Sequence, residues 1–193
     1  MRNVKTLGSV ALLALAVGMG MLSTMNKATG QAAMPGMAMP APAAVTRAVA
    51  VITPTKGNKV TGTIWLDATP AGVHIHGTII GMEPKSVHGF HIHEFGDMTS
   101  EDAMAAGGHY NPDHHPHGGP GPGLHNAGDL GNVSADETGK GNFDLVVPDI
   151  SLDGKNPVIG RSLVIHALED ILTPTANPGA RLGMGVIGIA KAP

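Results

Sequence analysis

The most informative part of the chain is Gly89-Phe90-His91-Ile92-His93-Glu94-Phe95-Gly96-Asp97, where two histidines stand two positions apart. In a β-strand, side chains at alternate positions leave the same face, so His91 and His93 would point together. Neutral imidazole is a ligand for copper and for zinc. The stretch therefore predicts a strand that holds one metal ion with two ring nitrogens.

Spacing alone does not establish a metal site, because His74-Ile75-His76 repeats it. In that segment we expect Val73 and Ile75 to face inward and the two histidines to face solvent. A pair of surface histidines is the alternative for His91 and His93 as well. Only the surrounding residues separate the two pairs.

From about residue 47 onward, short apolar segments alternate with turn residues. The chain of 193 residues has 28 Gly and 15 Pro and is 42% hydrophobic but only 3% aromatic, so a core must be built from Val, Ile, Leu and Ala. This pattern favours an all-β fold, an antiparallel sandwich or flattened barrel. Besides the strand with the histidine pair, we expect strands at 48–53, 60–68, 73–80, 143–147, 162–166 and 185–190.

Residues 97–131 break this pattern, because they are rich in Gly, Pro and His and show little apolar periodicity. A loop of this length inside a domain is usually functional or disordered. Strands bound this one and histidines fill it, so we expect it to be ordered by metal.

The N-terminus predicts a secretory signal over residues 1–30. Arg2 and Lys5 form a basic start, and the apolar run of residues 10–22 is too short to cross a bilayer comfortably. A membrane anchor is the alternative, although the absence of Cys excludes lipoprotein attachment through that residue. We expect a periplasmic or extracellular protein with no stable membrane span after processing.

Residues 31–46 form a Met/Pro-rich linker ahead of a domain at 47–193. Met34, Met37 and Met39 carry thioethers that suit Cu(I), so the linker is either a copper-capture arm or a plain tether. The formal net charge of −3 is too mild for a protein that tracks phosphates. Nucleic acid is therefore not an expected partner.

Further motifs follow in order along the domain, and with the stretch at 89–97 they resemble the copper/zinc superoxide dismutase family, in a bacterial secreted form that lacks cysteine. The resemblance covers roughly residues 47–193. It implies a Greek-key β-sandwich or flattened eight-stranded barrel with long metal-binding and electrostatic loops. The motifs are His109-Tyr110-Asn111-Pro112, His117-Gly118-Gly119-Pro120, Gly128-Asp129-Leu130-Gly131-Asn132-Val133, Gly160-Arg161-Ser162-Leu163-Val164-Ile165-His166, Gly179-Ala180-Arg181-Leu182 and Gly185-Val186-Ile187-Gly188-Ile189-Ala190.

Carried over by matching position, the resemblance implies two metal ions that share one ligand. The copper ligands would be His91, His93, His109 and His166. His109 would bridge to zinc as an imidazolate, with His117 and Asp129 as further zinc ligands.

The resemblance also implies roles for residues around the metals. Asp170 would link the two sites through hydrogen bonds that fix the orientation of the histidine rings. Arg181 would attract superoxide and position it beside copper, because a guanidinium stays charged at any working pH. His88 would be structural.

The remaining zinc ligand departs from the family pattern. The family usually has histidine three residues before the zinc aspartate, a position held here by Asn126, and His125 stands one residue too early. We expect His125 to bind zinc through a bulge at the glycines of 121–123. Otherwise zinc would bind weakly or not at all, as in a copper-only dismutase. His114 and His115 have no family counterpart and would be exposed or, at most, substitute ligands.

The family disulfide is also missing. Its two positions correspond to Ala103, in the loop before the bridging histidine, and Met184, in the last strand. A disulfide contributes about 2–4 kcal/mol. We expect the two apolar side chains to pack in its place and to restrain the loop less tightly.

The activity implied by the resemblance is dismutation of superoxide to oxygen and hydrogen peroxide, with copper and zinc as cofactors. His109 and Arg181 would be the catalytic residues. A secreted copper-binding or buffering protein on the same fold is the alternative. Such a protein would be expected to lose a copper histidine or the arginine, and all are present. The sequence leaves monomer and homodimer open.

Overall fold

The computed structural model describes residues 43–192. The predicted signal lies outside these residues, as do Met34, Met37 and Met39 of the linker. The strands are β1 (Arg47–Pro54), β2 (Thr61–Thr69), β3 (Gly72–Ile80), β4 (Val87–His93), β5 (Asp129–Ser134), β6 (Gly141–Val147), β7 (Ser162–His166) and β8 (Arg181–Ile189). Within the described range, the one helix is a 3-10 turn at Met104–Ala106, and none has the length and hydropathy of a membrane span.

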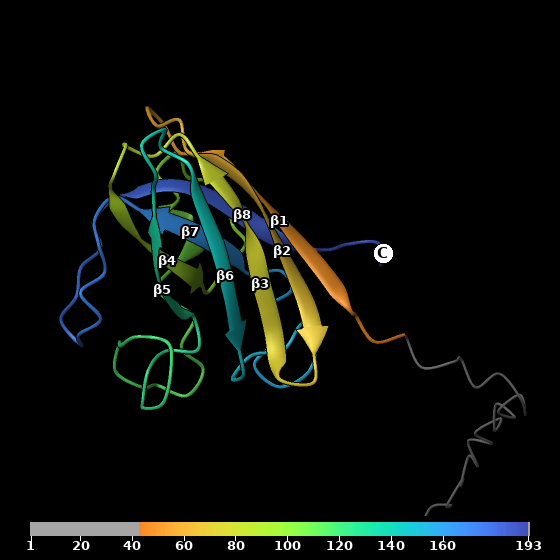
Figure 1. Ribbon diagram of the computed structural model, residues 1–193. Helices are drawn as coiled ribbons and strands as arrows, with labels where there is room; N and C mark the ends of the chain where they lie inside the picture. The colour runs from red at the N-terminus through yellow and green to blue at the C-terminus, as the bar shows by residue number, and fades with distance from the viewer. Residues whose placement is uncertain (1–42, 193) are drawn as a thin grey trace, which may run out of the picture. The chain divides into compact units, whose positions relative to one another are not determined.

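The strands pair antiparallel in the order β5-β4-β7-β8-β1-β2-β3-β6. The two end strands, β5 and β6, also approach each other, so the sheet is a nearly closed barrel. Figure 1 shows β2, β3 and β6 in front and β4 and β7 behind them. Sequence neighbours such as β3 and β4 are not paired, whereas β3 pairs with β6 and β4 with β7. The all-β barrel predicted from the sequence is confirmed.

Alternating apolar side chains fill the barrel. Ala48, Ala50 and Ile52 of β1 are buried, and Val49 and Val51 between them are more exposed. The other strands contribute mainly Val, Ile and Leu, as the composition predicted. An edge-to-face pair of Phe90 and Phe143, 4.8 Å between ring centres, joins the two layers.

Two strand boundaries differ from expectation. β5 begins at Asp129, inside the stretch expected to be loop, and β8 begins at Arg181 instead of residue 185. Both strands start with charged side chains that face the site, so hydropathy could not reveal them. The remaining loop runs from β4 to β5 and carries His109 and His117.

A small apolar cluster occupies the positions of the family disulfide. Ala103 and Met184 are each 2% exposed and pack with Ala106 and Val164. The loop before His109 is therefore attached to β7 and β8 by apolar packing.

Candidate metal centre

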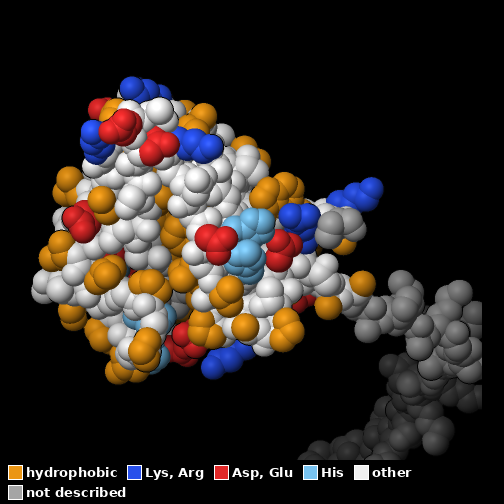
Figure 2. Space-filling model, viewed as in Figure 1, with side chains coloured by type: hydrophobic (Ala, Val, Ile, Leu, Met, Phe, Trp, Pro, Cys, Tyr) orange, Lys and Arg blue, Asp and Glu red, His pale blue; other side chains and the backbone are white. Residues whose placement is uncertain are grey.

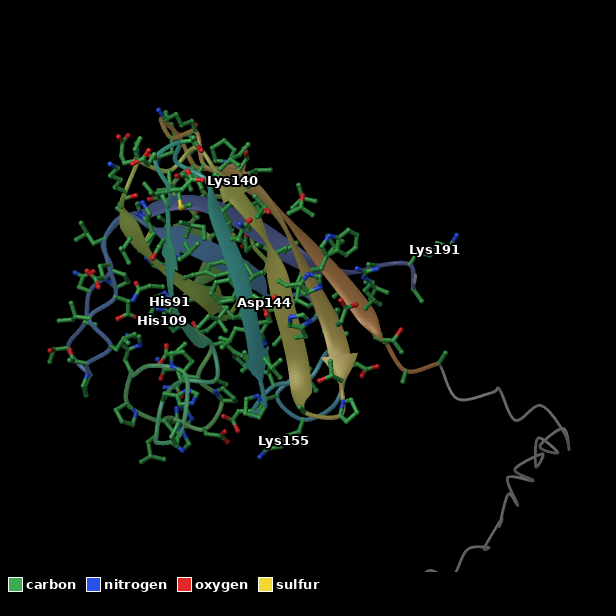
Figure 3. All side chains as sticks on the ribbon, viewed as in Figure 1. His91, His109, Lys140, Asp144, Lys155 and Lys191 are labelled. Atoms are coloured by element: carbon green, nitrogen blue, oxygen red, sulfur yellow. The ribbon has the colours of Figure 1, made fainter. Side chains whose placement is uncertain are left out.

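Strand β4 brings two buried histidines to one site. His91 and His93 are 0% and 1% exposed, because β5 and β7 flank the strand. The backbones of His93 and His109 form an isolated antiparallel β-bridge, which fixes the long loop against the end of β4. The rings of His91 and His109 stack with centres 3.9 Å apart, and Figure 3 shows both labels together beside β4.

Four histidines converge in the first metal-binding group, with ligand atoms all within 4.8 Å of one another: His91, His93, His109 and His166. Backbone carbonyls fix two of the rings, since Nδ1 of His93 lies 3.1 Å from the Gly107 oxygen and Nδ1 of His166 lies 3.2 Å from the Gly179 oxygen. The Nε2 atoms of these two rings consequently face each other at 3.1 Å.

The first group has the chemistry of a copper site. Among the described residues, Nδ1 of His91 is buried without a hydrogen-bond partner, which is an atom that a metal would satisfy. Burial lowers the pKa of His91 to about 4 and that of His166 to about 3, and it also lowers the pKa of His93. All three imidazoles are therefore neutral at pH 7, the state in which they bind metal.

A second group lies beside the first and consists of His91, His109, His117 and Asp129, again within 4.8 Å. Oδ1 of Asp129 is 2.8 Å from Nδ1 of His117 and 3.2 Å from Nδ1 of His109. Burial would raise the pKa of Asp129, but hydrogen bonds from His109 and the Gly118 amide outweigh it, and the pKa is lowered. The group is thus an anionic nitrogen–oxygen site of the kind that zinc occupies.

Asp170 joins the two groups. Its Oδ2 accepts from Nε2 of His91 at 2.8 Å, and its Oδ1 accepts from Nε2 of His117 at 2.9 Å. Asn132 holds the backbone of Asp170 through two hydrogen bonds, of 2.8 and 2.9 Å. Gly89 leaves room for this arrangement, because a Cβ there would lie 3.0 Å from Cε1 of His91 and 3.3 Å from Cβ of Asp170.

Comparison with known proteins agrees with this geometry. The family model of copper/zinc superoxide dismutase matches residues 60–187. The superoxide dismutase [Cu-Zn] of Paramecium bursaria Chlorella virus 1 is 39% identical over 155 residues, which are 76% of this chain and 82% of the viral protein. The chain belongs to the copper/zinc superoxide dismutase family. A crystal structure of the clock protein EA4 superposes with a TM-score of 0.69 at 38% identity, covering 76% of this chain and 96% of that one.

The structure does not bring His125 to the zinc side of this superoxide dismutase fold. Nδ1 of His125 lies 2.9 Å from the Asn126 carbonyl, and Nε2 lies 3.6 Å from Oδ2 of Asp149. Asn126 is the residue that faces Asp129, with Nδ2 3.2 Å from Oδ1. The positive φ angles of Gly121 and Gly123 do not carry His125 into the second group, so the structure does not support the zinc role expected of it. Among the described residues, His114 and His115 also lie outside both groups.

Arg181 stands beside the first group of histidines. It pairs with His166 across β7 and β8 and is partly buried. Its Nη1 and Nη2 donate to the carbonyls of Ala103 and Gly107, at 2.5 and 2.6 Å. After burial, its charge is the largest influence that lowers the pKa of His93. The guanidinium is thus fixed near the copper histidines by neutral carbonyls.

The second His-x-His pair is separate from the dismutase site, as its context predicted. His74 and His76 have side chains 32% and 30% exposed and hydrogen bond to Asp144 and Asp67, at 3.0 and 2.9 Å. Figure 2 shows pale blue histidine atoms flanked by red acidic side chains on the face toward the viewer. In Figure 3, Asp144 lies on this face, away from the labels of His91 and His109.

Sequence reasoning gave no role to three groups that shape the site. The carbonyls of Gly107 and Gly179 orient His93 and His166, and Gly107 also accepts from Arg181. Backbone acceptors carry no side-chain signal. Asn132 lies within a recognised motif, but its hold on Asp170 appears only in three dimensions.

Proposed function

We propose that the chain converts two superoxide anions and two protons into oxygen and hydrogen peroxide. Copper would be held by the first group, His91, His93, His109 and His166, and zinc by His109, His117 and Asp129. The observation that carries the proposal is the convergence of four histidines, three of them buried and neutral, beside a fixed guanidinium.

Copper held by this group would supply the redox chemistry for the oxidation of one superoxide and the reduction of another. The protein keeps the ligand nitrogens available by burying the rings and directing their other nitrogens to fixed acceptors. His93 and His166 use carbonyls for this purpose, and His91 uses Asp170. Such partners set the tautomer and orientation of ligand rings.

His109 is the residue that can move a proton. Its Nδ1 is directed to Asp129 at 3.2 Å, which leaves Nε2 on the side of the other copper histidines. Its side chain is 18% exposed, so the ring is in contact with solvent, unlike the other three histidines of the first group, which are buried. We assign to Nε2 of His109 the uptake of a proton and its delivery to the reduced oxygen species.

Arg181 supplies the positive charge that draws the anion to the site. Arg181 donates to carbonyls and forms no salt bridge among the described residues, although Asp102 lies near enough to influence it. A positive charge near a reaction centre raises the local concentration of an anionic substrate.

The matched histidine pairs offer a test. Superoxide decay is followed by stopped-flow spectrophotometry with the copper- and zinc-loaded protein, His93→Ala and His76→Ala. We expect decay catalysed by the wild type and by His76→Ala and little catalysis by His93→Ala. Equal activity of the two variants would contradict the assignment of the first group.

Location and assembly complete the proposal. A basic start with Arg2 and Lys5, followed by an apolar run at 10–22, supports export to the periplasm or the medium. N-terminal sequencing of protein recovered from the exported fraction tests this, with a start near residues 28–33 expected. A protein retained in the cytoplasm with Met1 intact would refute it. Light scattering decides between a monomer and a homodimer.

A further inference from the structure

We propose that Asn126 supplies the fourth zinc ligand through its side-chain oxygen, so that two imidazoles and two oxygens surround the ion. The inference rests on the proposed zinc assignment of His109, His117 and Asp129. It deepens that assignment by naming the group that replaces the missing histidine.

The first observation is an unsatisfied polar atom. Asn126 is 6% exposed, and its Oδ1 is buried with no hydrogen-bond partner among the described residues. Leaving a buried acceptor without a partner costs about 1–3 kcal/mol, so such atoms are uncommon in folded proteins. A ligand for that oxygen would remove the cost.

The second observation is the arrangement around Asp129. Three groups surround its Oδ1, namely Nδ1 of His117 at 2.8 Å, Nδ1 of His109 at 3.2 Å and Nδ2 of Asn126 at 3.2 Å. Zinc bonds of about 2.0–2.2 Å place the corners of a tetrahedron roughly 3.3–3.6 Å apart. Three of the six corner-to-corner distances, those that start at Asp129, are thus near or slightly below the spacing of a zinc site.

A 180° rotation of the side-chain amide group of Asn126 would complete the site. The nitrogen and oxygen of Asn occupy equivalent positions, and their environment decides which way the group faces. Without a cation, Nδ2 faces the Asp129 carboxylate and donates to it. With a cation between them, the oxygen end is favoured, because an amide oxygen has lone pairs that can bind the cation and an amide nitrogen offers only N–H donors.

The other candidates for this position are excluded by their contacts. His91 belongs to both groups, but its Nε2 is held by Asp170, and its one remaining nitrogen is required by copper. His125 turns toward Asp149 on the other side of the loop. Asn126 is held in place by its own backbone amide, which donates to Oδ2 of Asp129 at 2.9 Å.

An amide oxygen should make this zinc site weaker than one completed by a third imidazole. Neutral amide oxygens suit hard cations, and zinc sites are built mainly from nitrogen, sulfur and carboxylate. Asn126→Asp and Asn126→His should therefore both tighten zinc. Asn126→Leu has a similar volume but offers no donor, so it should loosen zinc.

The test is zinc affinity measured on the full, copper-loaded chain by competition with a chromophoric chelator. We expect a loss of at least about 10-fold for Asn126→Leu, the lower end of the loss seen when even an outer partner of a metal ligand is removed. Asn126→Asp should gain affinity, a result that a misfolded protein could not give. His125→Ala is the matched control and should leave affinity unchanged.

A spectroscopic measurement separates ligation from a structural role. Co(II) placed in the zinc site has visible bands that depend on its ligands, so they should shift in Asn126→Asp and stay unchanged in His125→Ala. Wild-type affinity and spectrum in both Asn126→Leu and Asn126→Asp would overturn this inference alone. A wild-type chain that takes up copper but no second ion would overturn the zinc assignment together with it.

Discussion

Oδ2 of Asp170 lies 2.8 Å from Nε2 of His91, and both side chains are fully buried. The other carboxylate oxygen reaches His117 at 2.9 Å. Burial would raise the pKa of Asp170, but the hydrogen bonds from the two histidines hold it well below its usual range. One anionic side chain therefore orients one ring of each metal-binding group.

Asp170→Asn should weaken both metal sites. An amide has only one acceptor atom, so it can accept from His91 or from His117 but not from both. Loss of such a partner lowers metal affinity by about 10- to 100-fold. Zinc and copper retained after dialysis against a chelator measure the effect. Unchanged retention of both ions would show that Asp170 does not orient the ligands.

Arg181→Ala should slow superoxide consumption without removing copper. The guanidinium contacts carbonyls and no proposed ligand directly, so the metal content should persist. Loss of a focusing charge should reduce the second-order rate constant by about 10-fold or more at low salt. Stopped-flow measurement of superoxide decay together with copper analysis checks this. An unchanged rate constant would show that Arg181 does not attract the substrate.

Met184→Ala should destabilise the fold substantially. Met184 is 2% exposed and packs with Ala103 at the position of the family disulfide. Truncation of a buried Met costs about 2–5 kcal/mol. Met104→Ala is the control, since Met104 is 60% exposed and a surface change stays within roughly 0.5 kcal/mol. Equal free energies of unfolding in urea for both variants would contradict the packing role.

The metal-free protein should lose stability as pH falls. Burial lowers the pKa of His91 to about 4 and of His166 to about 3, from the ordinary 6.5. Below pH 6.5 these histidines bind protons in the unfolded chain but not in the folded one. Their contribution to the free energy of unfolding is therefore fully present above about pH 6.5 and declines toward about pH 3.

His117 opposes part of this decline. Burial would lower its pKa, but Asp170 and Asp129 outweigh burial and raise it, so its contribution is present at low pH and lost as pH rises through the folded-state value. Urea unfolding of the metal-free protein between about pH 7 and pH 4 measures the net effect. Stability that is flat or rises toward acid would contradict the burial of neutral histidines.

The sequence predicted the site well where side-chain periodicity or a motif carries the information. The alternation around His91 and His93 indicated a strand, and the apolar composition indicated a β-barrel, both of which the structure has. The direction of His125 could not be predicted, because it lies in irregular backbone before β5, where no side-chain period fixes the direction of a residue.

Backbone groups mark another limit of sequence reasoning. Gly107 and Gly179 act through carbonyl oxygens that every residue possesses. The start of β5 at Asp129 could not be predicted for a different reason. Asp129 is buried, but a hydropathy pattern assigns a charged residue to an exposed loop. These features depend on which segments meet in space.

The most direct test of the central claim is a copper titration of the zinc-loaded protein with superoxide decay as the readout. We expect catalysis to rise in proportion to bound copper and to level off at one copper per chain, with His166→Ala remaining inactive at the same copper content. Tight binding of one copper by the wild type without catalysis would contradict it and would favour a copper-binding protein built on the dismutase fold.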